Sequence, residues 1–417
     1  MMKQMLALLL CTSLALSLLP GCTAASAARE LTAQEVYAAN YDGSPELAEQ
    51  VDAALSAFGL ELLRDTRAAQ EGSVLLSPLS VALALSMAAN GAEGETLAQF
   101  ETLLSGGSGL DVLNARCTQL MEEYQSLDGS TQCSIANSIW LDPDGQIQED
   151  FIGKCAGIFD AQVFQGDLSA PGIVRDLNGW VSKHTNKMIP TIISKPFAEN
   201  TASLLVNALY LKNTWASKFD PNNTYARAFT HTGGDTKSMD FLNKGSCTLP
   251  YLQGDGVQGV VLPYDDGRLG FFALLPDGDL DSWLAGLEGN ELSELLAGRE
   301  DAPFLRLALP KFEAEWKGDL KEILSALGLE DAFVPGVADF SLLGDNPEGY
   351  YLSQVIHAAK IKVNEKGTET AAATAEAGSG ESSAPLEDGI TLVFDRPFLY
   401  GIVDLETGIL LFLGTFE

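Results

Sequence analysis

Residues 367–389 constrain the fold most, because they lie between two strand-like stretches near the carboxyl terminus yet carry no core pattern. They read GTETAAATAEAGSGESSAPLEDG, with no aromatic residue and a single Leu among small and acidic residues. A stretch of this length without a core pattern is uncommon inside a compact domain, unless it is functional or disordered. Its composition favours a flexible, exposed loop. The rest of the chain must therefore build a core that leaves this segment at the surface.

The body of the chain alternates helix-like and strand-like stretches and predicts a single mixed α+β domain over residues 45–417. Apolar residues at spacings of three and four predict a first helix from Pro45, and a second helix ends at Ala89. Residues 203–211 form an almost continuous apolar run, which is typical of a central strand covered on both faces. Further strands are expected within residues 259–275, 304–309, 354–363, 390–394 and 399–404.

Residues 1–21 indicate a leader that is removed rather than part of the fold. Lys3 precedes an apolar stretch over residues 5–19, which is shorter than the roughly 20 residues that a membrane-spanning helix needs. Residues 19–22 read LPGC and resemble a bacterial lipobox, which implies lipidation of Cys22. The alternative is an ordinary signal peptide followed by an incidental cysteine.

Residues 22–44 are rich in Ala, Ser and Thr without an apolar period, so we expect them to form a tether. These features together predict an exported protein, lipid-anchored to the outer face of a bacterial cell membrane or shed from it. Contact with the membrane is expected only through the lipid.

The chain carries 57 Asp and Glu against 25 Lys and Arg, a formal net charge of −32. A surface of this charge repels phosphate backbones, so a nucleic-acid partner is excluded, and it favours a soluble monomer. Four cysteines remain once Cys11 is removed and Cys22 is lipidated, and they permit three pairings or none: Cys117, Cys133, Cys155 and Cys247. Small buried thiols are the preferred interpretation. Their spacing matches no zinc site, and neither a metal nor a cofactor is expected.

The chain has three histidines, and none accompanies a Gly-x-Ser-x-Gly nucleophile motif or a glycine-rich phosphate loop. We therefore do not expect an enzyme. His357 lies in an apolar stretch, where a hydrogen-bonded core histidine is the usual case.

Residues 363–375 read VNEKGTETAAATA and resemble the hinge of the reactive-centre loop of inhibitory serpins. Further motifs follow in the order of that family: SPLS at 77–80, NALYLKNTW at 207–215, LPY at 262–264, LPKF at 309–312 and RPFL at 396–399. The resemblance extends over about residues 46–416, the whole body of the chain.

The resemblance implies a fold of three β-sheets and about nine helices with an exposed reactive-centre loop. It also implies suicide inhibition, in which a serine protease cleaves the loop and the loop inserts into the main sheet before the acyl-enzyme is hydrolysed. The hinge residues carried over from the family are Glu365, Gly367, Thr368, Glu369, Thr370, Ala371, Ala372 and Ala373. Those carried over to the shutter and breach, the regions of the main sheet that open during insertion, are Ser77, Ser80, Asn207, Trp215 and His357.

The hinge residues sort into two faces when they are read as a strand. Thr368, Thr370 and Ala372 share one face, which carries no charge and no side chain larger than Thr, whereas Glu369 lies on the other face. We expect the uncharged face to enter the sheet, because burial of an unpaired carboxylate costs several kcal/mol. Thr370 stands where the family usually has Ala, and its hydroxyl needs a partner once it is buried.

The reactive bond is predicted by counting from the hinge. In inhibitory relatives about 17 residues separate the hinge Glu from this bond, because the inserted strand rises about 3.3 Å per residue and must span the sheet. Counted from Glu365, the bait is Glu381 followed by Ser382. The alternatives are Gly380, Ser383 and Leu386, the last from a count back from the RPFL motif, since the loop is a few residues longer than usual.

The loop also narrows the expected partners. A Glu bait suits a glutamate-preferring protease and a bond among Gly, Ser and Ala suits an elastase-like one, whereas the absence of Lys and Arg between Gly367 and Gly389 argues against trypsin-like targets. Residues 97–125 lack a basic cluster, so no heparin-like cofactor is expected. The alternative function is a non-inhibitory, serpin-fold binding lipoprotein, which large hinge residues would favour. A solute-binding lipoprotein is suggested by the lipobox alone, and the hinge motif disfavours it.

Overall fold

The computed structural model describes residues 26–39, 44–368 and 389–417. Within them the chain forms nine α-helices, two short 3-10 helices and three β-sheets. The helices are α1 Pro45–Ala69, α2 Pro78–Ala89, α3 Gly94–Ser105, α4 Leu110–Gln125, α5 Glu149–Phe159, α6 Gly172–His184, α7 Leu280–Ala285, α8 Glu291–Ala297 and α9 Lys321–Ala326. The 3-10 helices are η1 Pro221–Asn223 and η2 Asp331–Phe333.

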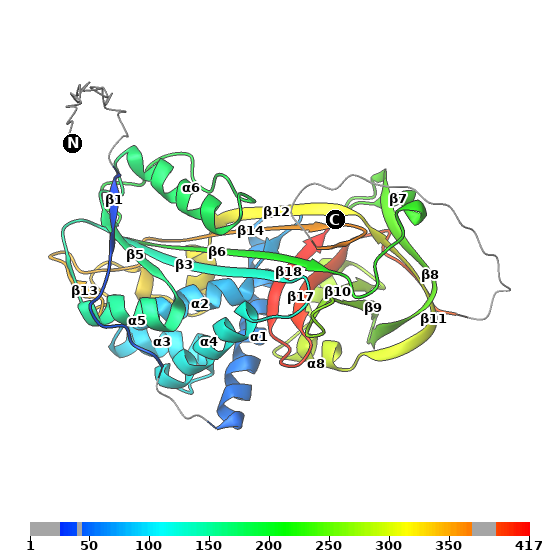
Figure 1. Ribbon diagram of the computed structural model, residues 1–417, viewed down its shortest axis with the longest axis horizontal. Helices are drawn as coiled ribbons and strands as arrows, with labels where there is room; N and C mark the ends of the chain where they lie inside the picture. Colours follow the sequence, from blue (N-terminus) through cyan, green and yellow to red (C-terminus); the bar gives the residue numbers. More distant parts are fainter. Residues whose placement is uncertain (1–25, 40–43, 369–388) are drawn as a thin grey trace, which may run out of the picture.

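A seven-stranded sheet runs along the long axis of the molecule (Figure 1). In spatial order its strands are β1 Ala28–Leu31, β5 Gln162–Gly166, β3 Gln132–Leu141, β6 Ser203–Thr214, β15 Gly367–Thr368, β14 Gln354–Val363 and β12 Phe312–Asp319. Helix α6 covers one face, and the helices α1 to α5 lie on the other side of the sheet (Figure 1).

A nine-stranded sheet forms the other end of the molecule. Its strands in order are β16 Thr391–Val393, β11 Glu300–Pro310, β8 Thr236–Gly254, β9 Val257–Pro263, β10 Leu269–Pro276, β17 Phe398–Asp404, β18 Leu410–Phe416 and β2 Leu75–Leu76, and β7 Tyr225–Thr230 pairs with β8. The third sheet pairs β4 Gln146–Ile147 with β13 Gly344–Asp345.

Strand β6 is covered on both faces, as its apolar run predicts. Leu205 and Leu209 join the large core beneath the sheet, whereas Leu204 and Val206 face the smaller core under α6. The alternation follows from the two-residue period of a strand. The mixed α+β class and the predicted strands of the carboxyl-terminal half are confirmed.

Part of the segment expected to be a tether, residues 22–44, is folded in the structure. Residues 28–31 form strand β1, which pairs antiparallel with β5 and so covers the edge of the large sheet. Without β1, strand β5 would present unpaired backbone N–H and C=O groups at the edge of the sheet. Backbone groups of this kind can pair with a strand of almost any sequence, so the residues of β1 need no particular pattern. Ala27 approaches so closely that a side chain at Gly166 would lie 2.2 Å from the Ala27 carbonyl oxygen. The ordered body therefore begins before residue 45.

Helix α1 also extends beyond the stretch that its apolar face predicts. Its last turns contain Arg64 and Arg67, whose side chains bind groups elsewhere in the fold. Arg64 donates to the Leu287 carbonyl, and Arg67 forms ion pairs with Glu417 and Asp281. These tertiary partners explain why a polar sequence continues the helix.

Candidate functional site

The two central strands of the large sheet, β6 and β14, pair along only part of their length. Residues 204–208 of β6 pair in parallel with residues 354–358 of β14. Beyond that point β15 lies between them, with Thr368 opposite both Val363 of β14 and Asn213 of β6. The sheet therefore has a closed end, where the strands pair directly, and an open end that the first hinge residues enter.

Thr368 occupies the open end with its side chain inside the protein. It is 1% exposed, and its hydroxyl hydrogen-bonds the hydroxyl of Tyr264. This burial agrees with the inward face predicted for the hinge. Gly367 precedes it where only glycine fits, because an added Cβ would lie 1.9 Å from the Asn213 carbonyl oxygen.

Trp215 packs beside the hinge at this end of the sheet. It is 2% exposed, and its ring stacks on Tyr264 with centroids 4.9 Å apart. Its backbone N–H donates to the Lys366 carbonyl at 2.9 Å, and its indole N–H donates to the Asn364 carbonyl at 2.8 Å. One tryptophan thus fixes the chain on the approach to the hinge.

Glu365 forms a charged contact at the open end. Its carboxylate accepts hydrogen bonds from Lys311 and Thr224, both at 2.9 Å. Burial raises the pKa of Glu365, but these hydrogen bonds, with that of Lys311 the stronger, hold the pKa below its usual range. The contact joins the hinge to residue 311, just before β12 begins.

The closed end contains a buried polar network of Ser77, Ser80, Asn137, Asn207 and His357, which we call the histidine network. The Ser77 N–H donates to His357 Nε2 at 3.0 Å, so the ring proton lies on Nδ1 and faces Asn207 Oδ1 at 3.2 Å. Asn207 also accepts from the Ser80 hydroxyl at 2.5 Å and donates to Asn137 Oδ1 at 2.7 Å. These bonds connect α2 and its amino-terminal cap to β3, β6 and β14.

Burial lowers the pKa of His357 to about 3, so the ring is neutral at physiological pH. The network therefore holds the closed end together through neutral hydrogen bonds. A buried network of this kind is costly to disrupt, because each orphaned group loses its partner without regaining water.

The structure thus brings Ser77, Ser80, Asn207 and His357 together at the closed end and places Trp215 with Glu365, Gly367 and Thr368 at the open end. The other predicted site residues lie outside the described residues: Cys22, Glu369, Thr370, Ala371, Ala372, Ala373, Glu381 and Ser382. Sequence reasoning assigned no role to Asn137, Tyr264, Asn213 or Lys311. The last three lie inside the motifs quoted above, and Asn137 lies beside Ser138 in the buried part of β3.

The four remaining cysteines are free in the described part of the chain. Burial raises the pKa of the thiols of Cys117 and Cys133 to about 12, and that of Cys155 further. These thiols are inert at neutral pH. Residues 26–39, 44–368 and 389–417 contain no group of three or more His, Cys, Asp or Glu side chains suited to hold a metal. No helix among them has both the length and the apolar composition needed to cross a membrane.

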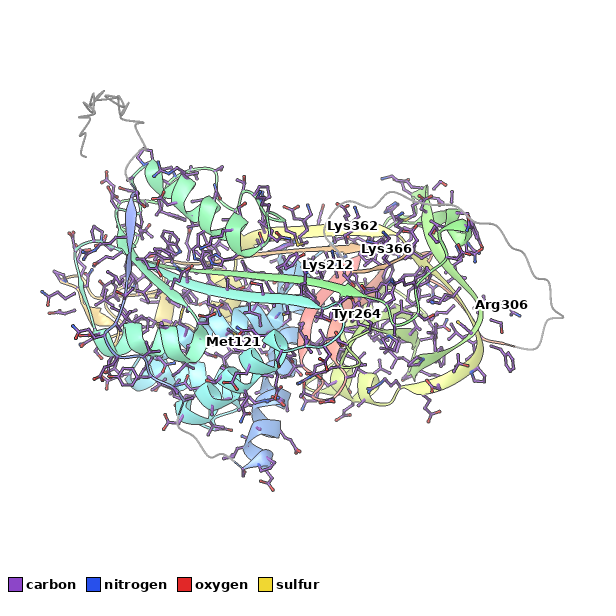
Figure 2. All side chains as sticks on the ribbon, in the orientation of Figure 1. Met121, Lys212, Tyr264, Arg306, Lys362 and Lys366 are labelled. Atoms are coloured by element: carbon purple, nitrogen blue, oxygen red, sulfur yellow. The ribbon has the colours of Figure 1, made fainter. Side chains whose placement is uncertain are left out.

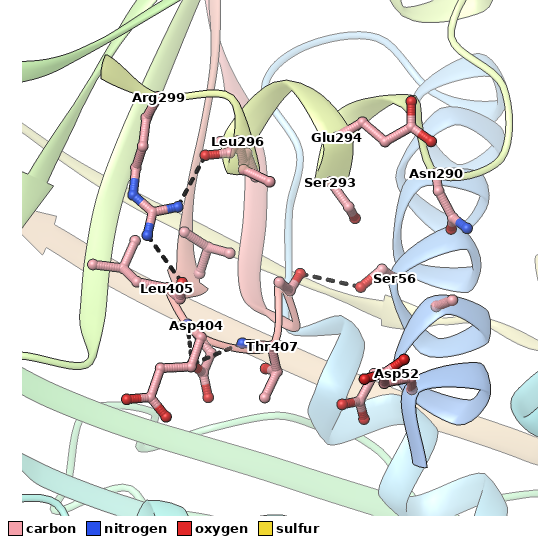
Figure 3. Close-up of a pocket in the computed structure, with 16 residues that line it drawn as sticks. Asp52, Ser56, Asn290, Ser293, Glu294, Leu296, Arg299, Asp404, Leu405 and Thr407 are labelled. Atoms are coloured by element: carbon pink, nitrogen blue, oxygen red, sulfur yellow. Dashed lines mark hydrogen bonds between the residues drawn. The ribbon is translucent and has the colours of Figure 1, made fainter. Parts of the chain in front are cut away.

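A cavity of about 580 Å³ lies far from the hinge, between α1, α8 and the turn from β17 to β18 (Figure 3). Several of its polar groups are bonded within the protein. Arg299 donates to the carbonyls of Leu296 and Leu405, and Ser56 donates to the Gly408 carbonyl. The cavity has no contact with the hinge or the histidine network.

Comparisons with known proteins agree with this geometry. Residues 53–417 match the family model described as serpin (serine protease inhibitor). The chain is 30% identical to an uncharacterized serpin-like protein of Thermococcus kodakarensis over 87% of this chain and 84% of that protein. It is 28% identical to leukocyte elastase inhibitor A of Mus musculus over 88% of this chain and 98% of the inhibitor. Among solved structures, native tengpin, a thermophilic serpin, superposes with a TM-score of 0.83 at 29% identity, over 93% of this chain and 97% of tengpin. The chain belongs to the serpin family.

Proposed function

We propose that this protein is a suicide inhibitor of serine proteases. The observation that supports it is the position of Thr368, which is the second residue of β15 and lies between β6 and β14, where the hinge sequence meets the sheet. Direct pairing of β6 with β14 ends at Ala208 and Ala358, and β15 meets β6 again only at Asn213. An incoming strand would supply ladder partners along the intervening edges, which favours insertion because buried backbone groups need partners.

In the proposed reaction the serine oxygen of the protease attacks the carbonyl carbon of the bait residue. The peptide bond breaks, the new amine leaves with a proton, and the bait residue is held as an ester on the protease. The freed hinge then continues inward from Thr368 and carries the esterified protease along the sheet. Hydrolysis of the ester fails if insertion is faster and distorts the protease active site.

The bait and the class of target remain proposals taken from the loop sequence. We propose Glu381–Ser382 as the reactive bond and a glutamate-preferring or elastase-like serine protease as the target. The test mixes the purified protein with glutamate-specific, elastase-like and trypsin-like proteases. We expect a covalent complex that survives SDS with at least one of the first two classes, and mass spectrometry of the released carboxyl-terminal fragment locates the bond.

The same experiment distinguishes the alternative. Clean cleavage of the loop by every protease in the panel, without any covalent complex, would contradict inhibition and favour a non-inhibitory binding protein. A complex formed only with trypsin-like enzymes would leave inhibition intact but refute the proposed bait.

We also propose that Cys22 is lipidated and anchors an exported protein to the outer face of a bacterial cell membrane, from which it can be shed. The support is the LPGC sequence at residues 19–22. Mass spectrometry of the mature amino terminus in a bacterial host is expected to find a diacylated Cys22. A Cys22→Ala variant should then fractionate away from the membrane, and an unmodified cysteine in the parent protein would refute the anchor.

A further inference from the structure

Cationic and aromatic side chains from three strands of the nine-stranded sheet gather around a cavity whose lining contains no carboxylate. We call Tyr225, Arg227, Lys244, Phe304 and Arg306 the cationic patch. They come from three strands, β7, β8 and β11. Tyr225 and the three cations line a cavity of about 300 Å³, and no Asp or Glu takes part in its lining.

The two arginines of the patch have no acidic partner within the described residues. None of the ion pairs there includes Arg227 or Arg306. Arg227 donates to the Tyr225 hydroxyl at 2.8 Å, and its buried Nε has no partner. Lys244 donates only to neutral oxygens, those of Ser217 and the Lys218 carbonyl.

Unpaired cations are unexpected in a chain with 57 acidic and 25 basic residues. The cavity in Figure 3 has the opposite balance, with five carboxylates and the single cation Arg299 in its lining, whereas the cavity beside the loop after α6 is also rich in cations, with Lys195, Lys317 and Lys321 against Asp319. A further cavity near β13 is lined by four carboxylates and no Lys or Arg. The cationic patch therefore departs from the acidic character of the molecule.

The aromatic members of the patch are exposed. Tyr225 is 48% and Phe304 46% exposed, and they are two of the six large hydrophobic side chains exposed among the described residues. Phe304 has a φ of 60°, in the left-handed region, at a register shift between β11 and β8. Such a backbone is strained for a phenylalanine and persists only where its surroundings enforce it. Tyr and Arg are also enriched among the residues that dominate binding at protein interfaces.

The patch adjoins the chain that follows the reactive segment. The Arg306 N–H donates to the Ile390 carbonyl at 2.8 Å, and Arg306 lies opposite Thr391 in the ladder between β11 and β16. Gly389 packs directly on the Phe304 backbone. Arg306 lies in the same half of the molecule as Lys366, which lies between the hinge residues Glu365 and Gly367 (Figure 2). A protease attached to the loop would thus meet this face on the carboxyl-terminal side of the reactive bond.

We propose that the cationic patch docks an acidic surface segment of the target protease, a role that rests on the proposed inhibitory function. Carboxylates of the protease pair with Arg227 and Arg306, and its surface packs on Tyr225 and Phe304. Charge pairs at the rim of an interface mainly raise the rate of association, and buried aromatic contacts slow dissociation. The patch selects proteases whose surface beside the active site is acidic.

The test compares two double variants with the same change in net charge. R227E/R306E reverses the patch, whereas K183E/K195E reverses two exposed lysines, one on α6 and one in the loop after it. We expect R227E/R306E to lower the second-order rate constant for complex formation at least about tenfold. The fraction of cleaved inhibitor that ends in covalent complex should not change, because the hinge is intact. K183E/K195E should have a rate within about twofold of the parent protein, because its charges lie away from the encounter surface.

An equal loss of rate in both double variants, or no loss in either, would overturn the proposal. The neutral variant R227Q/R306Q guards against misfolding, and it should slow association less than R227E/R306E does while melting at the parent temperature.

A second assay does not require trapping. It measures, by surface plasmon resonance, the binding of the protein to a protease whose nucleophilic Ser is replaced by Ala. Weaker binding by R227E/R306E in that assay supports docking even if no covalent complex forms, whereas absence of trapping by the parent protein contradicts only the proposed function. Sedimentation showing that the patch instead joins two copies of this chain would refute the assignment to a protease.

Discussion

The two ends of the gap between β6 and β14 are held by different chemistry. At the closed end the strands pair directly and the histidine network joins them through buried, neutral hydrogen bonds. At the open end Thr368 is inserted, and the nearby contacts include the charged and partly exposed pair of Glu365 and Lys311. Neutral buried bonds are costly to break, whereas partly exposed ion pairs contribute little to stability. Under the proposed mechanism we therefore expect the sheet to open from the hinge toward the histidine network.

Replacement of the inserted residue should have the largest effect. Thr368→Arg places a charged side chain where Thr368 is 1% exposed, so the loop cannot continue into the sheet. We expect the covalent complex to fall at least about tenfold while cleavage of the loop continues, because the protease still reaches the bond. Titration of residual protease activity and SDS gels measure both outcomes. Thr102→Arg, on an exposed face of α3, is the control, and unimpaired trapping by Thr368→Arg would refute the register.

The closed end should be the more costly to break. Asn207→Ala removes an amide that binds Ser80, Asn137 and His357, leaving several buried groups without partners. We expect the free energy of unfolding to fall by roughly 2–4 kcal/mol, since each orphaned group costs about 1–3 kcal/mol. Urea unfolding measures the change. Asn290→Ala, at an exposed position before α8, should change it by less than about 0.5 kcal/mol, and equal effects of the two variants would remove the distinction between the ends.

Acid should weaken the closed end first. The pKa of His357 is about 6.5 in the unfolded chain and about 3 in the folded protein. Between these two pH values the ring is protonated in the unfolded state and neutral in the folded state. Stability should therefore fall with pH below about 6.5, by up to about 1.4 kcal/mol per pH unit, until the folded ring itself titrates.

The measurement is the difference in unfolding free energy between the parent protein and His357→Gln at pH 7 and pH 5. We expect the parent to lose more stability over this interval. His184→Gln is the control. Burial also lowers the pKa of His184, but this ring is only half-buried, so its replacement should change the pH dependence of stability less than His357→Gln does. Parallel pH profiles for the parent and His357→Gln would show that the histidine network does not sense acid.

The charged contact at the open end should have the smallest effect. The pKa of Glu365 is lowered in the fold, so its pair with Lys311 stabilises the protein above about pH 4.3, the value in the unfolded chain, and is lost as the pH falls through the lower folded value. Glu365→Gln should lower stability at pH 7 by less than about 1 kcal/mol, and this difference should shrink as the pH falls below about 4.3. Glu315→Gln, in the exposed pair with Lys360, serves as the matched control in chemical unfolding. If Glu365→Gln lowered the free energy of unfolding more than Asn207→Ala does, the open end and not the closed end would be the more strongly held.

Local sequence patterns predict part of the fold and the inward face of the hinge, whereas the three sheets, the number of helices and the shutter and breach residues come from the family resemblance. The apolar run in β6 predicts a doubly covered strand, and the small residues around Thr368 predict the face that enters the sheet. Local sequence patterns do not predict which residues, distant in the sequence, these side chains bind. Asn137 meets Asn207 only because β3 lies beside β6, and Lys311 meets Glu365 across 54 residues of sequence. Strand β1 is not predicted from the sequence, because it pairs with β5 through backbone groups and its side chains therefore show no pattern.

If Cys22 is lipidated as proposed, strand β1 limits how far the folded body can stand from the membrane. Ser26 and the Ala27 N–H both bind Asp176 of α6, so Cys22, which carries the proposed lipid, is four steps along the chain from the folded body, with three residues between them. At about 3.5 Å per residue, that connection reaches about 14 Å. Because β1 lies at the end of the molecule opposite β7 and β8, a lipid anchor at Cys22 would hold the body close to the bilayer with the cationic patch directed outward, toward an arriving protease (Figure 1).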